Sequence, residues 1–320
     1  MQRFTSIAAL TALLLTAAAC GSDSSSAGTT SAPETTGVDT TVDTTAPASS
    51  APDTTTASTD EAQAAKAIVS LSPTATEMLF AIGAGDQVIA VDDQSNYPAE
   101  ALDKPHDLSG FEPNVEAIAA LQPDLVIMQD PTIQEQLEAL GIPVWIGSAA
   151  ATFDDVYTQI EQLGVATGHV AEAAELVAQM QSDIDAAVQA APTTSKGLSY
   201  YHELDPTLYS LTSNTFAGQV YALFGLTNIA DGAQEGNDYP QLNAEYIVQQ
   251  NPALVFLADT KCCAESPETV VARPGWDAID AVAKGDVVAL DDDIASRWGP
   301  RIVDYVQAVA DALAKVPAGA

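Results

Sequence analysis

Few side chains in this sequence could support covalent or metal chemistry. The adjacent cysteines Cys262 and Cys263 could form a vicinal disulfide, remain free thiols or bind a soft metal. The histidines His106, His169 and His202 show no spacing typical of a metal site. No nucleophile elbow, P-loop, GxGxxG turn or HExxH helix is present. We therefore expect no catalytic residues, no cofactor and no metal ligands.

Two glutamates, Glu116 and Glu245, recur in the same sequence context. Residues 114–128 read NVEAIAALQPDLVIM, and residues 243–257 read NAEYIVQQNPALVFL. In each copy the asparagine is a suitable helix N-cap and the glutamate lies in the first turn, where the helix dipole favours a carboxylate. A proline then ends the helix before an apolar run. A helix followed by a buried strand is half of a βαβ unit, so the repeat predicts two similar α/β lobes.

Polar residues follow the first predicted strands. Residues 66–71 indicate a buried strand, and Ser72 with Pro73 is typical of a helix N-cap and first helical position. A second strand is predicted at 87–91, followed by a polar loop at 92–97 that contains Gln94. Open α/β sheets bind ligands at the carboxyl ends of their strands. Ser72 and Gln94 are therefore candidate ligand-binding residues.

Residues 152–190 have a helical pattern almost throughout, which Gly164 and Gly168 are expected to divide in two. Thr152 and Asp155 form a capping box, and the second part is amphipathic. A helix of roughly twenty residues spans about 30 Å, the width of a small domain. It could join the two lobes as a rigid rod or pack on one lobe only. Further strands are expected at 124–129, 142–146, 198–203, 228–230 and 287–290, with helices at 132–140, around 216–223 and from Pro300 onward.

The charge and the N-terminus limit the possible partners. A net charge of −34 with only ten basic residues argues against a nucleic-acid binder and against docking on anionic lipid, but suits a basic protein partner. Arg3, an apolar run and small residues before Cys20 resemble a bacterial lipoprotein signal at 1–20; the alternative is an ordinary secretory signal. Residues 21–62 are rich in Ser, Thr, Pro and Asp and are expected to be a disordered tether. With Cys20 lipidated, Cys262 and Cys263 can pair only with each other or with another molecule, which favours the disulfide.

Four segments of the chain resemble one known family. They are SLSPTATEMLFAIG at 70–83, NVEAIAALQPDLVI at 114–127, RPGWDAIDAVAKGDVVAL at 273–290 and SRWGPRIVD at 296–304. Together, over about residues 65–313, they resemble the cobalamin and iron-siderophore class of substrate-binding proteins for ABC importers. The resemblance implies an α/β fold of class III, with two Rossmann-like lobes (63–151 and 193–320) joined by one long rigid helix within 152–192, and a ligand between the lobes.

The resemblance also implies roles for single residues. One glutamate on each lobe docks onto arginines of the permease in this family, and Glu116 and Glu245 match those positions; the alternative is that both are ordinary solvated carboxylates. Compared with the cobalamin-binding member, Asp293 and Arg297 keep an Asp-x-x-x-Arg spacing before the last helix. Arg297 could pair with an anionic edge of the ligand or only bridge to Asp293.

Other ligand positions match the family less closely. Tyr239 stands where the cobalamin-binding member has an aromatic residue before proline, and His202 stands where it has phenylalanine. Gln94 and Gly110 replace aromatic residues, although Phe111 is adjacent to Gly110.

The implied function is an extracytoplasmic substrate-binding protein, anchored in the cell membrane by lipid. It would capture a ferric siderophore or a cobalamin-type ligand and deliver it to a permease of two transmembrane subunits with their ATPase. Basic residues are scarce, with Lys261, Arg273 and Arg297 the plausible ones near the ligand, which favours a neutral or weakly charged ligand. A monomer is expected. The alternatives are a haem or metal-ion binding protein and, less favoured, an enzyme on the same fold.

Overall fold

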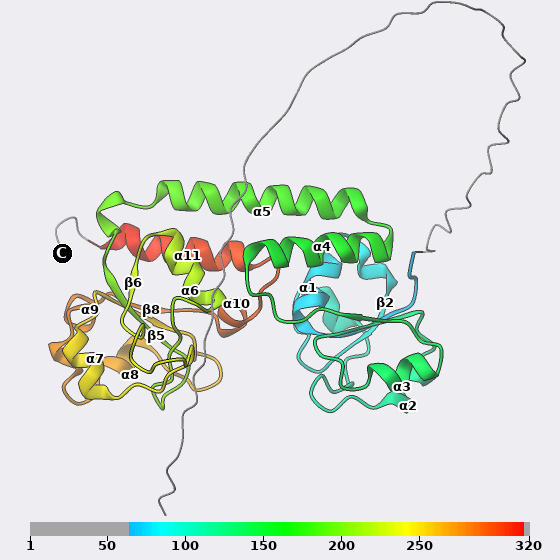
Figure 1. Cartoon of the computed structure of the whole chain (residues 1–320), viewed down its shortest axis with the longest axis horizontal. Coiled ribbons are helices and arrows are strands. Elements are labelled where there is room, and N and C mark those ends of the chain that lie inside the picture. The colour runs from blue at the N-terminus through cyan, green and yellow to red at the C-terminus, as the bar shows by residue number, and fades with distance from the viewer. Residues whose placement is uncertain (1–63, 317–320) are drawn as a thin grey trace, which may run out of the picture. The chain divides into compact units, whose positions relative to one another are not determined.

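Residues 64–316 are described in the computed structural model of this protein (Figure 1). The predicted signal peptide at 1–20, including Cys20, and the predicted tether at 21–62 lie outside these residues. The described helices include none that is both long and apolar enough to cross a membrane. We call residues 64–167 the first lobe and residues 197–316 the second lobe.

The first lobe is built on a parallel sheet of four strands in the order β2-β1-β3-β4. The strands are β1 (Ile68–Leu71), β2 (Val88–Val91), β3 (Leu125–Met128) and β4 (Val144–Ile146). Both β1 and β3 are buried at every position, as expected for strands covered on both faces. Three helices connect these strands: α1 (Pro73–Ala81), α2 (Val115–Ala120) and α3 (Gln134–Ala139).

The second lobe repeats this strand order. Its parallel sheet runs β6-β5-β7-β8, with β5 (Ser199–Glu203), β6 (Thr227–Asn228), β7 (Leu254–Leu257) and β8 (Val287–Ala289). The helix and strand of each sequence repeat, α2 with β3 and α7 (Ala244–Gln250) with β7, occupy equivalent places. Asn114 and Asn243 cap these helices, each accepting a backbone N–H at 2.9 Å. The predicted duplication of one α/β unit is therefore confirmed.

The other helices of the second lobe vary in length. They are α6 (Phe216–Leu223), α8 (Pro267–Val271), α9 (Asp280–Lys284), α10 (Asp292–Ser296) and α11 (Ile302–Lys315). Three of these helices, α8, α9 and α10, were not predicted from the sequence. Each has five residues, which is too short to show a helical period in the sequence.

Two long helices follow the first sheet, α4 (Phe153–Thr167) and α5 (Val170–Ala190). The capping box of Thr152 and Asp155 is present, and Gly168 ends α4 in the left-handed conformation, with φ 81°. Gly164 does not divide the helix, contrary to the prediction. It lies inside α4, where a Cβ would come within 2.5 Å of the Ala173 side chain, so glycine is needed there for close packing of α4 against α5.

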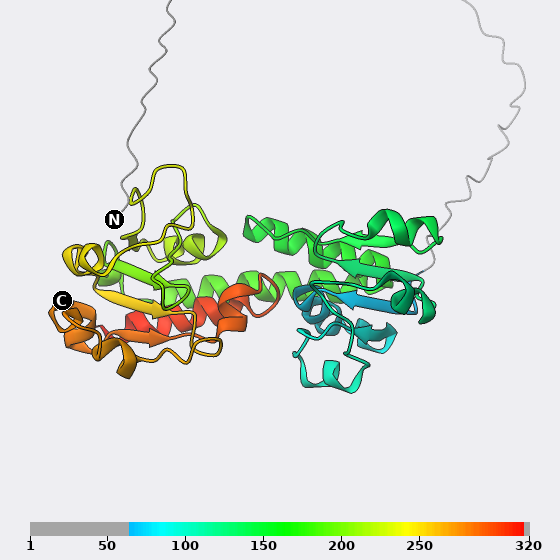
Figure 2. The same ribbon diagram turned by 90° about the horizontal axis from the view of Figure 1, so that it is seen from below.

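The α5 helix packs against helices of both lobes, against α4 along one half of its length and against α11 along the other (Figure 1, Figure 2). A continuous apolar cluster contains Met78 and Ile160 of the first lobe, Met180 of α5, and Tyr200 and Val309 of the second lobe. A core that continues through α5 holds the two lobes as close-packed neighbours. The expected fold class, two α/β lobes joined by a long rigid helix, is confirmed, and the alternative of a helix packed on one lobe only is wrong.

Candidate ligand-binding site

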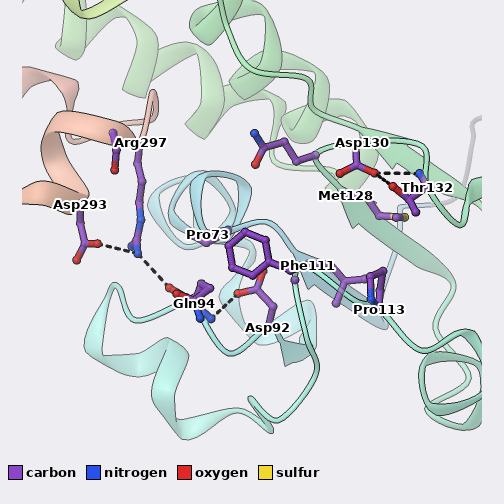
Figure 3. Close-up of a pocket in the computed structure, with 14 residues that line it drawn as sticks. Pro73, Asp92, Gln94, Phe111, Pro113, Met128, Asp130, Thr132, Asp293 and Arg297 are labelled. Atoms are coloured by element: carbon purple, nitrogen blue, oxygen red, sulfur yellow. Dashed lines mark hydrogen bonds and ion pairs between the residues drawn. The ribbon is translucent and has the colours of Figure 1, made fainter. Parts of the chain in front are cut away.

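A cavity of about 440 Å³ lies between the carboxyl ends of the first sheet and α10 of the second lobe (Figure 3). The loops after β1, β2 and β3 all contribute to its wall, as expected for the ligand edge of an open parallel sheet. The lining residues come from both lobes: Leu71, Pro73, Asp92, Gln94, Gly110, Phe111, Pro113, Met128, Gln129, Asp130, Thr132, Asp293, Ser296 and Arg297.

Asp92, Gln94 and Phe111 form the part of the first-lobe wall that follows β2. The Asp92 carboxylate is 1% exposed and accepts the Gln94 N–H at 2.9 Å through Oδ1. Burial raises the pKa of Asp92 above its ordinary value, although hydrogen bonds oppose this. A Cβ on Gly110 would lie 3.0 Å from the Asp92 carboxylate, so glycine lets the loop cover it. The next residue, Phe111, is 82% exposed and offers an aromatic surface at the cavity (Figure 3).

Asp130 lies at the end of β3 and was not among the predicted site residues. It is exposed and accepts hydrogen bonds from the backbone N–H of Thr132, at 2.9 Å, and from the Thr132 hydroxyl. These hydrogen bonds hold the pKa of Asp130 below its ordinary value. The rule that pointed to Ser72 and Gln94, a polar residue just after a buried strand, would also have found Asp130.

Arg297 bridges the two lobes. Its guanidinium donates to Gln94 O at 3.1 Å and to Asn96 Oδ1 at 2.7 Å, and it pairs with Glu77 at 3.2 Å and Asp293 at 2.9 Å. The alternative that Arg297 only bridges to Asp293 therefore describes part of its contacts, because three of its four partners belong to the first lobe. Asp293 adds another contact between the lobes by accepting from Asn96 at 3.3 Å.

Glu77 on α1 was missed by the sequence analysis. Its side chain is 1% exposed and pairs with Arg297 and with Arg301, whose Nε donates at 2.8 Å. The Arg301 guanidinium also lies 4.2 Å from the centre of the Tyr97 ring. Glu77 is the one charged residue in the apolar stretch after Ser72, which could have indicated a buried carboxylate. Its partners Arg297 and Arg301 could not have been predicted, because they lie more than two hundred residues away in the sequence.

Three predicted ligand residues do not line the cavity. Ser72 is buried and caps α1 by accepting the Ala75 N–H at 3.3 Å, so its neighbour Pro73 forms the wall instead. His202 is fully buried in the second lobe, with Nδ1 2.7 Å from the Tyr221 hydroxyl. Burial lowers the pKa of His202 to about 3. Tyr239 is exposed in the loop that precedes α7.

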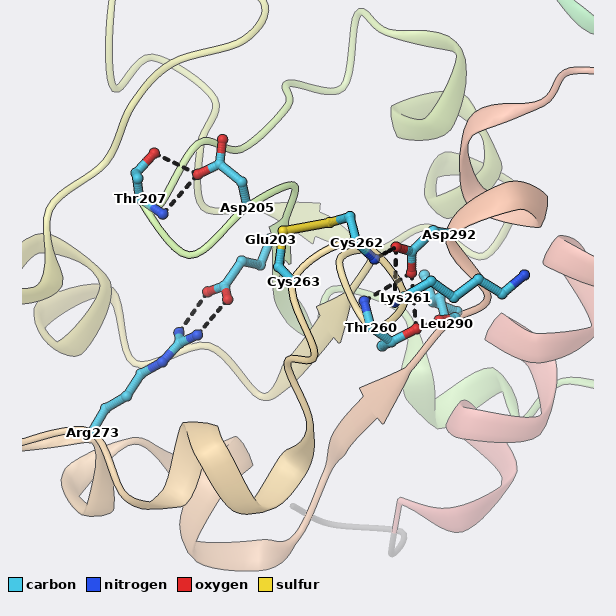
Figure 4. Close-up of a disulfide and its surroundings, with 10 residues drawn as sticks. All are labelled: Glu203, Asp205, Thr207, Thr260, Lys261, Cys262, Cys263, Arg273, Leu290 and Asp292. Atoms are coloured by element: carbon cyan, nitrogen blue, oxygen red, sulfur yellow. Dashed lines mark hydrogen bonds and ion pairs between the residues drawn. A yellow bond between two sulfur atoms is a disulfide. The ribbon is translucent and has the colours of Figure 1, made fainter. Parts of the chain in front are cut away.

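Cys262 and Cys263 are joined in a disulfide in the exposed loop after β7 (Figure 4). The carboxylate of Asp292 accepts backbone N–H groups from Thr260, Lys261 and Cys262 at 2.8, 2.9 and 2.9 Å. This loop is therefore fixed to the start of α10, which carries Asp293. No group of three or more His, Cys, Asp or Glu side chains that could hold a metal occurs within residues 64–316.

A cluster of charged side chains, Glu203, Glu265 and Arg273, lies near the disulfide loop. Arg273, one of the basic residues considered for the ligand, donates to Glu203 at 2.6 Å and to Glu265 at 2.8 Å and does not line the cavity (Figure 4). Asp259 is fully buried, and neither of its carboxylate oxygens accepts a hydrogen bond from a described residue. Burial, with the charges of Glu203 and Glu265, raises the pKa of Asp259 to about 7.

Glu116 and Glu245 are exposed in the first turns of α2 and α7. Both helices lie on the side of their lobes away from α5 (Figure 1). Each lobe thus presents one carboxylate at the start of an equivalent helix.

Two lobes of one topology, a rigid connecting helix and a cavity lined from both lobes define a two-lobed binding protein. The sequence matches the periplasmic binding protein family over residues 68–294, and the chain belongs to this family. The family resemblance found in the sequence is confirmed, and the family is one of binding and transport proteins.

Named relatives agree with this assignment. The chain is 31% identical over 258 residues to an uncharacterized ABC transporter substrate-binding lipoprotein, YvrC, of Bacillus subtilis, covering 78% of this chain and 80% of the relative. It is 32% identical over 260 residues to a cobalamin-binding protein of Halobacterium salinarum, covering 77% and 68%. The crystal structure of an ABC-type Fe³⁺-hydroxamate transport system from Saccharomonospora viridis is similar with a TM-score of 0.59 and 27% identity, covering 78% and 93%.

Proposed function

We propose that this protein is the extracytoplasmic substrate-binding component of an ABC importer and that it captures a ferric siderophore or a cobalamin-type compound between its lobes. The observation that carries the proposal is the cavity at the carboxyl ends of the first sheet, lined by residues of both lobes. Its volume of about 440 Å³ lies in the range of small-molecule sites. Relatives named for cobalamin and for Fe³⁺-hydroxamate support this ligand class.

The proposed mechanism is capture by a nearly preformed cleft. The shared apolar core and the contacts of Arg297 with the first lobe favour small movements of the lobes over a wide hinge opening. Phe111 would cover an apolar face of the ligand, and Gln94 and Asp130 would contact its polar edge. No step of this mechanism needs a catalytic residue or a cofactor.

Delivery would use the two exposed carboxylates on the lobes. Glu116 and Glu245 lie at equivalent helix starts, so a permease built from two similar subunits could meet each with an equivalent basic pocket. Lipidation of Cys20 and the tether at 21–62 would keep a monomeric binding protein near that permease. The relative named as a lipoprotein supports this part of the proposal.

The test is isothermal titration calorimetry of the purified full-length protein with cyanocobalamin and with ferrichrome, a neutral ferric trihydroxamate. We expect saturable binding of one ligand with a Kd of about 1 μM or tighter. Phe111→Ala should weaken it about tenfold or more, because the aromatic contact is lost. Leu140→Ala, which removes an exposed apolar side chain outside the cavity, is the control. Binding that Phe111→Ala leaves unchanged would reject this cavity as the site.

Delivery needs a separate test in cells. Charge reversal of Glu116 and Glu245 together should abolish uptake of the bound ligand while leaving its Kd unchanged, because both side chains lie outside the cavity. Normal uptake by the double variant would reject the docking role.

A further inference from the structure

The cavity has a second-lobe wall, formed by Asp293, Ser296 and Arg297, and a first-lobe wall, formed by the other lining residues. The charged side chains of the second-lobe wall are paired with each other and with neighbouring residues. On the second-lobe wall, Asp293 pairs with Arg297 and also accepts a hydrogen bond from Lys261 at 2.8 Å. Arg297 is the only basic residue among the described residues that line the cavity, and its side chain is 12% exposed. Its guanidinium already contacts four acceptors, three of them in the first lobe. The positive charge of Arg297 is therefore not available for an anionic ligand.

The first-lobe wall carries negative charge without a basic partner. Asp130 is exposed to the cavity, and its hydrogen bonds within residues 64–316 come from Thr132, an uncharged residue. Asp92 is 1% exposed, and its Oδ2 accepts no hydrogen bond from any described residue. The loop at Gly110 covers this oxygen, so Asp92 acts on a ligand through its negative charge and not by a direct hydrogen bond. The neighbouring Asp93, which accepts the Gly110 N–H at 3.3 Å, adds to the negative field.

We propose that the first-lobe wall selects ligands by charge, with Asp130 as the specificity-determining residue and Asp92 reinforcing it. This inference rests on the proposed function and deepens it by naming the ligand class. The preferred ligand presents N–H donors or a positive charge to the first lobe, as the peripheral amides of a corrinoid or the ammonium of a hydroxamate siderophore would do. A ligand edge that carries carboxylates is rejected, because Asp130 repels it and Arg297 is not free to compensate.

The same wall argues against haem. Haem carries two propionates, which need basic partners when they are removed from water. Axial ligands to haem iron come from His, Cys, Tyr or Met. Of these types, the cavity lining within the described residues contains only Met128, which is 3% exposed. The cavity therefore fits neither the charged edge nor the metal of haem.

The experiment compares ligands that share one metal-binding core and differ in the charge of a single peripheral group. Ferrioxamine B carries a free ammonium, its N-acetyl derivative has none, and its N-succinyl derivative carries a carboxylate instead. A corrinoid pair, cyanocobalamin and a derivative with one peripheral amide hydrolysed to a carboxylate, tests the same property. The full-length protein is titrated by calorimetry with both series and with haemin, at low and at high salt.

We expect affinity to fall from the cationic to the neutral to the anionic ferrioxamine, or from the neutral to the anionic corrinoid if the corrinoids bind. Each step should be about fivefold at low salt and smaller at high salt. Asp130→Asn should flatten the series, Asp130→Glu should restore it, and Asp130→Lys should invert it. Glu175→Gln, which removes an exposed carboxylate from α5, is the matched control and should leave the series unchanged.

The outcomes separate this inference from the proposed function. Failure of both series and of haemin to bind would reject the proposed function itself. Binding in which the carboxylate derivative equals or exceeds the neutral one, or tight binding of haemin, would overturn charge selection while leaving a binding protein. A charge order that persists in Asp130→Asn would move the selection to another residue and also overturn the assignment.

Discussion

Asp130 and Asp259 occupy the same place in the two lobes, each two residues after the third strand of its sheet. Asp130 is exposed at the cavity, and its hydrogen bonds from Thr132 lower its pKa. Asp259 is fully buried, and burial together with nearby carboxylates raises its pKa to about 7. The repeated unit thus preserves the backbone topology while giving the same residue type opposite environments.

The neighbouring strands account for the difference. Leu71 of β1 lies opposite Met128 of β3, whereas Glu203 of β5 lies opposite Leu257 of β7. The second lobe therefore places a buried carboxylate beside the loop after its third strand and neutralises it with Arg273. We infer that the second lobe uses its charges to hold its own structure, while the first lobe leaves one carboxylate free for the ligand.

The largest expected effect comes from breaking the buried pair of the second lobe. Arg273→Ala leaves Glu203, which is 0% exposed, without its charged partner, and should lower the free energy of unfolding by about 3–5 kcal/mol. Urea denaturation followed by circular dichroism measures this. The control is Lys284→Ala, which removes an exposed ion pair with Asp280 and should lower the free energy of unfolding far less. Equal losses in the two variants would contradict a structural role for the buried pair.

The two aspartates should differ in how they link stability to pH. The pKa of Asp259 is raised in the folded state, so its contribution to stability is complete below the unfolded pKa, near 4, and is lost as pH rises through about 7. Asp259→Asn should remove this loss, which is on the order of 2 kcal/mol between pH 5 and pH 8. Urea denaturation at the two pH values tests it. If the variant retained the whole pH dependence, the buried charge would not be its source.

His202 should produce the opposite pH dependence in the same lobe. Its folded pKa is lowered to about 3, so protonation of the unfolded chain destabilises the fold as pH falls from about 6.5 toward 3. Between pH 7 and pH 5.5 the loss should be about 1 kcal/mol, and His202→Phe should abolish it. Unfolding curves at both pH values measure the difference, with the exposed His106→Gln as the control. An unchanged pH dependence in His202→Phe would count against a neutral buried imidazole.

The smallest expected effect is on the stability of the first lobe. Asp130→Asn should change the free energy of unfolding by less than about 0.5 kcal/mol, because the side chain is exposed and its hydrogen bonds within the described residues come only from Thr132. The same urea titration detects this change. A loss of several kcal/mol would show that the two aspartates are both structural and would end the contrast between the lobes.

Most of the fold could be predicted from local patterns. The strands of both sheets, the N-caps Ser72, Asn114 and Asn243, and the capping box before α4 depend on residues close together in sequence. The duplicated helix and strand could be recognised because its apolar run and its cap recur at the same spacing. Gly164 was misinterpreted because its role depends on Ala173 in the next helix, which a local pattern does not show.

The site was predicted less completely. Gln94, Phe111, Asp293 and Arg297 line the cavity, whereas Ser72, His202 and Tyr239 do not. Both faces of a parallel sheet are covered, so the sequence of a strand does not show toward which face a given side chain points. The burial of His202 in the second lobe therefore could not be predicted from the sequence.

The sequence by itself determined the class of fold, the family and the acidic character of the protein, because strand periodicity, helix caps, the motif order and the charge are properties of the chain. Only the tertiary structure decided which charges are free. Arg297 is engaged by Glu77 and Asn96 from the other lobe, and Asp259 is buried while Asp130 is exposed. The physical reason is that the energy of a charge depends on the partners and water around it, and these are set by contacts between residues far apart in the sequence.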